Sequence, residues 1–364
     1  MVPLKLAILG TRGVPPQYGG FETFAAELGT RLVQRGHEVS IYCRTRTGEP
    51  AWNGIRRIEL PAFPHKYLET VSHAFLSALD AMRRDFDVVL VCNAANAFTV
   101  PLLRAARMPV AINVDGIERK RRKWNLLGRA VYMTGEAFSV SFANRVIADA
   151  EVIAEYYREQ FAIEPEVIPY GSEFPVENDS DVLQRLGIAT RNYILYVSRF
   201  EPENNPLEVV EAYRKLEGAP PLVMLGSALY DKALSEQLER SKSERVVFPG
   251  ALYGNDYRTL QRNALIYVQA TEVGGTHPAL IEAMASGGAV LAHDTPENRE
   301  VGGDSVGYFA LRPEETLSTA LRAWLLQPEE REAFRARART HARGRFSWEA
   351  VTEEYEGLFR RLAG

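Results

Sequence analysis

The hydrophobic and polar positions of the chain define two alternating kinds of segment. Short apolar runs of strand length recur, separated by longer stretches in which apolar residues return with helical spacing. Strands that alternate with helices are typical of a mostly parallel sheet, so the pattern predicts an α/β fold. The runs are LKLAIL, EVSIYC, DVVLVC, PVAINV, RVIAD and EVIPY in the first half, and YILYVSR, LVMLG, RVVFPG, LIYVQA, AVLAHD and VGYFAL in the second.

The two series of runs indicate two domains. The 364 residues exceed the roughly 100–200 of one typical domain. The segment GSEFPVENDSD, after Tyr170, is rich in turn formers and acidic residues, as expected of an interdomain connection. We therefore predict domains over residues 1–172 and 173–345. The last segment, 346–364, has apolar residues at helical spacing and is expected to form a helix that packs on a neighbour.

Bulk charge and composition exclude some classes of protein. A net charge of −4 gives no global reason to expect nucleic-acid binding. The two cysteines, Cys43 and Cys92, lie at or near the ends of strand-like runs, where small buried thiols fit better than a disulfide. The N-terminus resembles no targeting segment, and no apolar stretch approaches the ~20 residues that span a bilayer. From these features we expect a cytoplasmic protein. The histidines show no metal-ligand spacing, so we also expect no structural metal.

The most informative segment is EVGGTHPALIEAMASGGAVLAHD, residues 272–294. Gly274, Gly275 and Thr276 precede a helix expected to begin near Pro278, and backbone N–H groups at such a start can face a phosphate. One turn into the helix, Glu282 can accept hydrogen bonds from the hydroxyls of an attached ribose. The competing interpretation is a tight turn followed by a solvated helix residue.

Other candidate phosphate ligands follow the apolar strands YILYVSRF and LAILG. Arg199 comes at the carboxyl end of the first of these, where ligands bind in open α/β sheets, and its guanidinium can bind phosphate oxygens bidentately. In GTRGVPPQYGGFETF, Arg12 lies in a glycine-rich loop, and Gly19 and Gly20 open a helix whose terminus is available to anions.

The glycine-rich loop also leaves a dehydrogenase open as an alternative. The loop is not GxGxxG, and the second strand ends in Arg44 rather than in the acidic residue that binds the ribose of NAD. Arg44 and Arg46 could instead serve the 2′-phosphate of NADP.

Four segments together resemble glycosyltransferase family 4. They are residues 281–287 in the segment described above, the strand ending in Arg199, the N-terminal stretch LAILGTRGVPPQYGGFETFAAELGTRLVQRGHEVSIYC, and INVDGIERKRRKWN. The resemblance covers essentially the whole chain. It is most specific to a bacterial subgroup that makes cell-surface polysaccharide and includes rhamnosyltransferases that use dTDP-rhamnose. It implies a GT-B fold, with two Rossmann-like domains facing each other across a cleft and a last helix crossing back to the first domain.

The resemblance also implies an activity. The second domain would hold a nucleoside diphosphate sugar, for which dTDP-L-rhamnose is the best candidate. The first domain would hold a saccharide or lipid-linked saccharide acceptor. The transfer would retain the anomeric configuration and need no cofactor. A nucleotide-sugar epimerase of the same fold and a non-catalytic sugar-nucleotide-binding protein stay open as alternatives.

The family pattern assigns roles to individual residues of the donor site. Arg199 would bind the diphosphate and Glu282 the ribose, with His277 beside them contributing its backbone. Two positions depart from the pattern. Asn204 stands where many members carry a lysine. Nine residues rather than the usual seven lie between Glu272 and Glu282, so the contact of Glu272 with the donor sugar is open.

The acceptor side is expected around Asp115 and the basic segment that follows it. Asp115 comes after the strand PVAINV and would orient the acceptor hydroxyl or stabilise charge at the anomeric carbon, unless it is a helix cap. Residues 118–133 contain five consecutive cations, including Lys120, then Trp124 and an apolar face. A solvated helix is the default interpretation of such a run. The alternative is contact with an acceptor diphosphate or with anionic lipid, as a peripheral protein of the inner plasma-membrane face.

Overall fold

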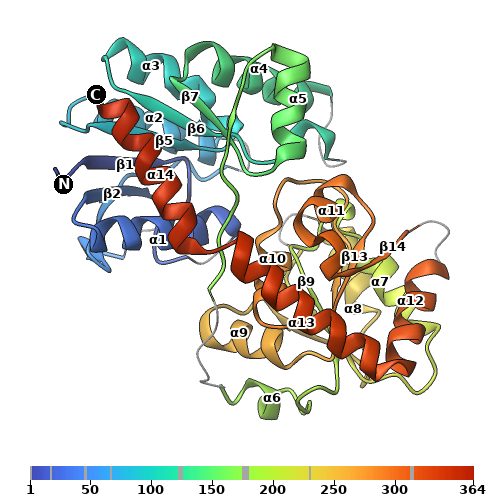
Figure 1. Cartoon of the computed structure of the whole chain (residues 1–364). Helices are drawn as coiled ribbons and strands as arrows, with labels where there is room; N and C mark the ends of the chain where they lie inside the picture. Colours follow the sequence, from blue (N-terminus) through green and yellow to red (C-terminus); the bar gives the residue numbers. More distant parts are fainter. Residues whose placement is uncertain are drawn as a thin grey trace. The chain divides into compact units, whose positions relative to one another are not determined.

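The computed structural model describes residues 2–16, 19–44, 47–65, 68–121, 126–173, 180–228, 231–311 and 315–364, with only the backbone at Lys120, Leu127 and Glu315. These residues form two compact units. The first comprises Met1–Lys120, Trp124–Gly171 and Trp348–Gly364, and the second Arg121–Lys123 and Ser172–Ser347. Both are α/β units (Figure 1).

The first unit is built on an eight-stranded sheet within the described residues, in the order β3-β4-β2-β1-β5-β6-β7-β8. All its strand pairs are parallel except β3 with β4. The strands are β1 (Lys5–Leu9), β2 (Glu38–Cys43), β3 (Ala51–Trp52), β4 (Ile55–Glu59), β5 (Val88–Cys92), β6 (Val110–Asn113), β7 (Arg145–Ala148) and β8 (Glu166–Val167).

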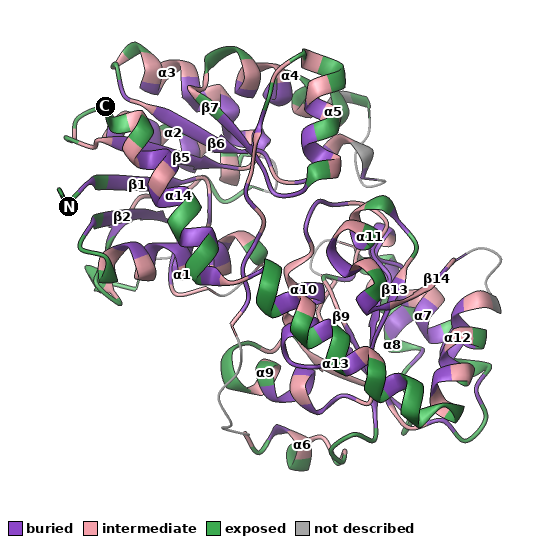
Figure 2. Cartoon of the chain, in the orientation of Figure 1, coloured by how far each residue is buried: buried purple, intermediate pink, exposed green. Residues whose placement is uncertain are grey.

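Helices cover this sheet. They are α1 (Gly20–Gln34), α2 (Glu69–Ala81), η1 (Ala94–Thr99), α3 (Val100–Ala105), η2 (Glu118–Lys120), α4 (Leu126–Phe142), α5 (Glu151–Phe161) and α14 (Trp348–Ala363). Helix α14 packs against α1, while α2, α3 and α4 pack in sequence with one another (Figure 1). The central strands are fully buried, which explains why they read as continuous apolar runs rather than alternating ones (Figure 2).

The β3–β4 hairpin is the element that the apolar pattern did not predict. Its strand β4 reads IRRIE, with arginines that interrupt the apolar run. The turn between the strands places Asn53 at φ 46° and Gly54 at φ 80°, the left-handed conformations for which Asn-Gly is the preferred pair. The Asn-Gly dipeptide was therefore the available signal in the sequence.

The second unit is built on a six-stranded parallel sheet within the described residues, in the order β11-β10-β9-β12-β13-β14. The strands are β9 (Ile194–Val197), β10 (Leu222–Leu225), β11 (Val246–Gly250), β12 (Ile266–Gln269), β13 (Val290–His293) and β14 (Gly307–Phe309). The prediction of mostly parallel sheets is thus confirmed in both units.

The helices of the second unit connect these strands and extend beyond them. They are α6 (Val182–Arg185), η3 (Pro202–Asn204), α7 (Pro206–Arg214), α8 (Lys232–Glu239), α9 (Gly254–Asn263), α10 (Pro278–Ala285), α11 (Pro296–Gly302), η4 (Gly303–Ser305), α12 (Glu315–Leu326) and α13 (Pro328–Arg345). Among the described residues of either unit, no helix is both long enough and apolar enough to cross a bilayer.

Candidate functional site

In the second unit, the order in which the chain adds strands to the sheet reverses between β9 and β12. These two strands are parallel neighbours, with Ile194 opposite Ile266 and Tyr196 opposite Val268. From β9 the chain proceeds outward to β10 and β11, whereas from β12 it proceeds the other way to β13 and β14. The crevice outside the carboxyl ends of two such strands is where open α/β sheets bind ligands. Arg199 follows β9 and the glycine turn follows β12, so the pairing brings both to this edge.

The turn before α10 is tightly built. A Cβ atom on Gly274 would lie 2.3 Å from Cε1 of His277, so a side chain there would displace the imidazole. Gly275 and Thr276 are buried, and α10 begins at Pro278 as expected. Burial, and after it the charge of Arg121, lowers the pKa of His277 to about 4. The imidazole is therefore neutral at pH 7, and its side chain does not cap the helix.

Two residues of α9 orient the Glu282 carboxylate, one directly and the other through the first. The hydroxyl of Tyr257 donates a hydrogen bond to its carboxylate, and the Gln261 amide donates to the Tyr257 oxygen at 2.7 Å and to the Ala279 carbonyl at 3.1 Å. Burial and then the charge of Glu282 raise the pKa of Tyr257 well above its ordinary value, so the phenol stays a donor. This arrangement fixes the half-buried carboxylate one turn inside α10. No motif in the sequence marked Tyr257.

The loop after β9 is fixed by its own hydrogen bonds. The Asn204 amide donates to the Arg199 carbonyl at 2.6 Å, and the Tyr196 hydroxyl donates to the Asn204 carbonyl at 2.6 Å. The backbone N–H of Glu272 donates to the Glu203 carbonyl at 2.9 Å, which ties this loop to the glycine turn. The Asn204 amide thus shapes the loop, while the Arg199 side chain is 41% exposed and 3.9 Å from Glu201.

In the first unit, the strand order reverses in the same way between β1 and β5. A Cβ atom on Gly10 would lie 2.3 Å from the Cys92 carbonyl, so the loop after β1 passes very close to the end of β5. Glu22, in the first turn of α1, is buried and accepts a hydrogen bond from the backbone N–H of Arg12 at 2.9 Å. Gly19 is the N-cap of α1 and Gly20 its first residue.

Asp115 lies at the same carboxyl edge of the first unit. Its backbone N–H donates to Oδ1 of Asn113 at 3.0 Å, and the Asn113 amide donates to the Tyr355 hydroxyl of α14 at 2.9 Å. Burial, followed by the charges of Glu22 and Asp115, raises the pKa of the Cys92 thiol at the end of β5. Asp115 has φ 60°, whereas helix N-caps prefer the extended region. This conformation argues against the capping interpretation.

The basic segment divides between several environments. The Arg119 guanidinium donates to Tyr156 and pairs with Glu136 at 3.3 Å in the first unit, while Arg121 belongs to the second. Lys120 is described only as backbone in η2, and Arg122, Lys123 and Trp124 lie outside the described residues. Further along, α4 exposes Leu126, Val131 and Met133 at 84%, 55% and 54%.

Of the two arginines considered as ligands for the 2′-phosphate of NADP, the structure describes only Arg44. The side chain of Arg44 is 9% exposed, donates to Thr70 at 3.2 Å and lies 3.9 Å from Glu69, so it is already engaged in the first unit. Arg46 lies outside the described residues.

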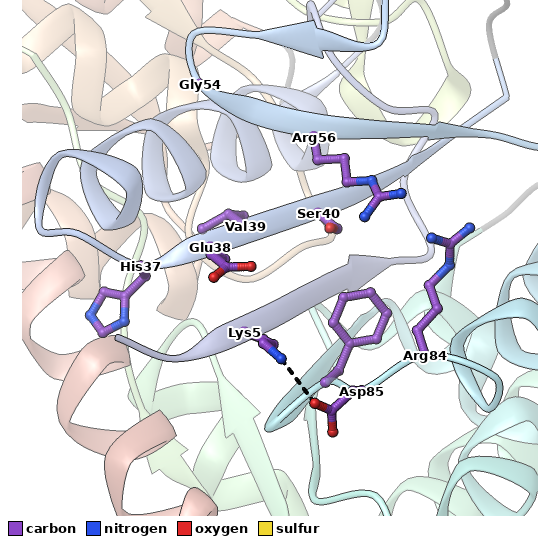
Figure 3. A pocket seen from close by; sticks show the side chains of 10 residues that line it. Lys5, His37, Glu38, Val39, Ser40, Gly54, Arg56, Arg84 and Asp85 are labelled. Atoms are coloured by element: carbon purple, nitrogen blue, oxygen red, sulfur yellow. Dashed lines mark hydrogen bonds and ion pairs between the residues drawn. The ribbon is translucent and has the colours of Figure 1, made fainter. Parts of the chain in front are cut away.

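A separate pocket of about 420 Å³ lies at the opposite, amino ends of β1 and β2 (Figure 3). Lys5 and Glu38, the first residues of these strands, line it together with Arg56, Arg84 and Asp85. Lys5 pairs with Asp85 at 2.9 Å, and this exposed pair contributes little stability. The pocket shares no residue with the predicted site.

Comparison with protein families gives one match in each half of the chain. Residues 19–171 match the family described as glycosyl transferase 4-like domain, and residues 180–341 match glycosyl transferases group 1. A relative in sequence is alpha-monoglucosyldiacylglycerol synthase of Streptococcus pneumoniae. It is 24% identical over 308 residues, which are 77% of this chain and 69% of the relative.

Solved structures resemble the whole chain in fold. Sucrose-phosphate synthase of Thermosynechococcus elongatus superposes with a TM-score of 0.81 at 20% identity, covering 98% of both chains. HepE of Anabaena, solved with UDP-glucose, gives 0.80 at 15% identity over 98% of this chain and 99% of the other. The glycosyltransferase WaaG of lipopolysaccharide biosynthesis gives 0.74 at 18% identity over 97% and 99%.

Proposed function

Because the chain is a glycosyltransferase of the GT-B fold, we propose that its second unit binds a nucleoside diphosphate sugar through Arg199 and the turn before α10. The placement of these two groups at the switch point between β9 and β12 carries the proposal. A diphosphate there receives one guanidinium and the N–H groups of residues 274–276, which compensate the charge of the leaving group. HepE, of the same fold, is solved with UDP and UDP-glucose.

Glu282 binds the nucleotide ribose in this proposal. Its carboxylate is already oriented by the Tyr257 hydroxyl, so little side-chain entropy remains to be lost when a ribose hydroxyl binds. Deoxyribose retains the 3′-hydroxyl, and the contact is therefore compatible with dTDP as well as with UDP. Glu272 lies beside this site and is the candidate contact for the donor sugar.

The donor sugar that we propose is L-rhamnose on dTDP, transferred with retention of the anomeric configuration. Its support is the resemblance of the N-terminal sequence to the rhamnosyltransferase subgroup. UDP-glucose is the competing donor, because the name of the sequence relative includes a glucosyl group and HepE is solved with UDP-glucose.

The acceptor is a saccharide or lipid-linked saccharide bound by the first unit. Asp115 orients its hydroxyl, and Arg12 faces its anionic groups. The name of the sequence relative includes a diacylglycerol product, which supports a lipid-borne acceptor. The exposed apolar residues of α4 would then rest on an anionic cytoplasmic membrane surface, and Lys120 would add charge attraction.

The donor proposal is tested by thermal stabilisation with dTDP, UDP, GDP and NADP at equal concentrations. We expect one nucleoside diphosphate to stabilise the protein and Arg199→Ala to weaken its binding by tenfold to a hundredfold, since hydrogen bonds to charged groups contribute about 1.5–3 kcal/mol. Lys242→Ala, which removes an exposed cation paired with Glu239, is the matched control. Stabilisation by NADP alone would refute the proposal.

Acceptor-free incubation with the stabilising nucleotide sugar separates transfer from epimerisation. A transferase should leave the sugar configuration unchanged, whereas an epimerase converts it without an acceptor. Membrane contact is tested by sedimentation with vesicles of phosphatidylglycerol or of phosphatidylcholine alone. Val131→Asp with Met133→Asp should reduce sedimentation with the anionic vesicles, and equal sedimentation of this variant and the wild type would exclude α4 as the contact.

A further inference from the structure

Arg121, in the basic segment, belongs to the second unit. Its Nη1 lies 3.2 Å from Glu201 and 3.4 Å from Glu203, and its side chain is 9% exposed. The Glu203 side chain is fully buried, and an ionised carboxylate in such a position requires a counter-ion. Arg121 provides it.

The same network reaches the proposed diphosphate ligand. One carboxylate oxygen of Glu201 lies 3.9 Å from Nη1 of Arg199, and the other lies 3.2 Å from Arg121. Glu201 therefore stands between two guanidinium groups and is nearer to the buried one. An anion that binds Arg199 must compete with this carboxylate, and a carboxylate neutralised by Arg121 competes less.

The position of Asn204 makes this neutralisation more important. The family pattern has a lysine there, but the Asn204 amide donates to the Arg199 carbonyl and carries no charge. With two carboxylates and one guanidinium, this loop would repel a diphosphate. With Arg121 added, the charges of the four groups balance, and the N–H groups of the glycine turn add positive potential.

We propose that Arg121 is a positioning residue of the donor site: it neutralises Glu201 and Glu203, and so leaves the guanidinium of Arg199 to bind the diphosphate of the nucleotide sugar. This inference rests on the proposed function, because it concerns the affinity of the same site. Arg121 acts through the carboxylates and need not touch the nucleotide.

Removing Arg121 alone would leave the buried Glu203 without its counter-ion and could unfold the unit. The test therefore uses the double variant R121A/E203Q, whose native fold is verified by circular dichroism and thermal melting. We expect it to bind the nucleoside diphosphate selected by the wild type about tenfold more weakly in calorimetric titration. R121K retains the positive charge and should bind within about threefold of the wild type. R129A removes an exposed cation of α4 and should bind like the wild type.

A variant that restores affinity distinguishes the charge effect of Arg121 from a merely structural role of this residue. Adding E201Q to R121A/E203Q removes the remaining competing carboxylate, and affinity should return to within about threefold of the wild type. An unchanged affinity of R121A/E203Q, or a triple variant that stays as weak as the double one, would overturn the inference. If R199A still weakens binding in either case, the proposed function stands. If the wild type binds no nucleoside diphosphate, the proposed function fails first.

Discussion

Glu356 of α14 is expected to be a principal electrostatic contact that holds this helix on the first unit. Its carboxylate lies 2.9 Å from Arg35 at the end of α1 and 2.7 Å from Arg360, and 3.1 Å from Nε2 of His37. The other ring nitrogen, Nδ1 of His37, accepts a hydrogen bond from the backbone N–H of Leu4 at 3.0 Å. Glu356 therefore links α14 to the end of α1 and to His37, which in turn bonds Leu4, the residue before β1.

The free energy of this cluster follows from the titration of the carboxyl group. Burial alone would raise the pKa of Glu356, but the hydrogen bonds from Arg360, Arg35 and His37 outweigh it and lower the pKa to about 2, from an ordinary value of 4.5. Such a difference corresponds to roughly 3 kcal/mol. Because water reaches both arginines, we reduce the expected contribution to about 2 kcal/mol.

The perturbation is Glu356→Gln, which keeps the size of the side chain and removes its charge. At pH 7 it should lower the free energy of unfolding of the first unit by about 2 kcal/mol. Since the native pKa is depressed, this stability is present above about pH 4.5 and is lost as the pH falls toward 2. The difference between variant and wild type should therefore shrink to less than half at pH 3.

The assay is urea unfolding at both pH values, combined with hydrogen exchange of α14 peptides, because two units need not unfold in one transition. Glu353→Gln, on the exposed face of the same helix, is the matched control and should change stability by less than about 0.5 kcal/mol. An equal effect of Glu356→Gln at pH 7 and pH 3 would refute the electrostatic explanation.

Three further substitutions test the hydrogen bonds and the packing of the sites. Tyr257→Phe removes the donor that orients Glu282 and should weaken nucleotide binding about fivefold to tenfold in calorimetric titration, with the fold intact. Gly274→Ala forces the adjacent imidazole to move and should abolish most nucleotide-induced thermal stabilisation; full stabilisation would show that the turn is not used. Tyr355→Phe removes the hydrogen-bond partner of Asn113, and should lower kcat while the nucleotide Kd stays constant; a parallel change in both would contradict a role on the acceptor side.

The glycine turn and α10 were predicted well because their signals are local. Pro278 fits the first turn of a helix, and the structure starts α10 there. The glycines at 274 and 275 indicate a turn, and the contact with His277 then explains why a side chain does not fit at Gly274. The hairpin with Asn53 and Gly54 was missed although its signal was equally local, because the arginines of β4 hid the apolar alternation.

The partners of the site residues could not be predicted in the same way. Tyr257 precedes Glu282 by 25 residues, and Arg121 precedes Glu203 by 82. Neither pair shares a turn or a helix face, so no spacing rule connects them. The Asn204 amide donates to the Arg199 carbonyl within the loop, a contact that depends on the path of the backbone from Arg199.

The sequence by itself determined most of the elements, because the pattern of apolar residues reports how each helix or strand is buried. It also determined where chains turn, since glycine, proline and asparagine act on their own backbone. Only the tertiary structure decided that β9 pairs with β12, and so that Arg199 and the glycine turn meet at one edge. The order of strands depends on contacts between segments far apart in the chain, and a local pattern carries no information about which strand lies beside which.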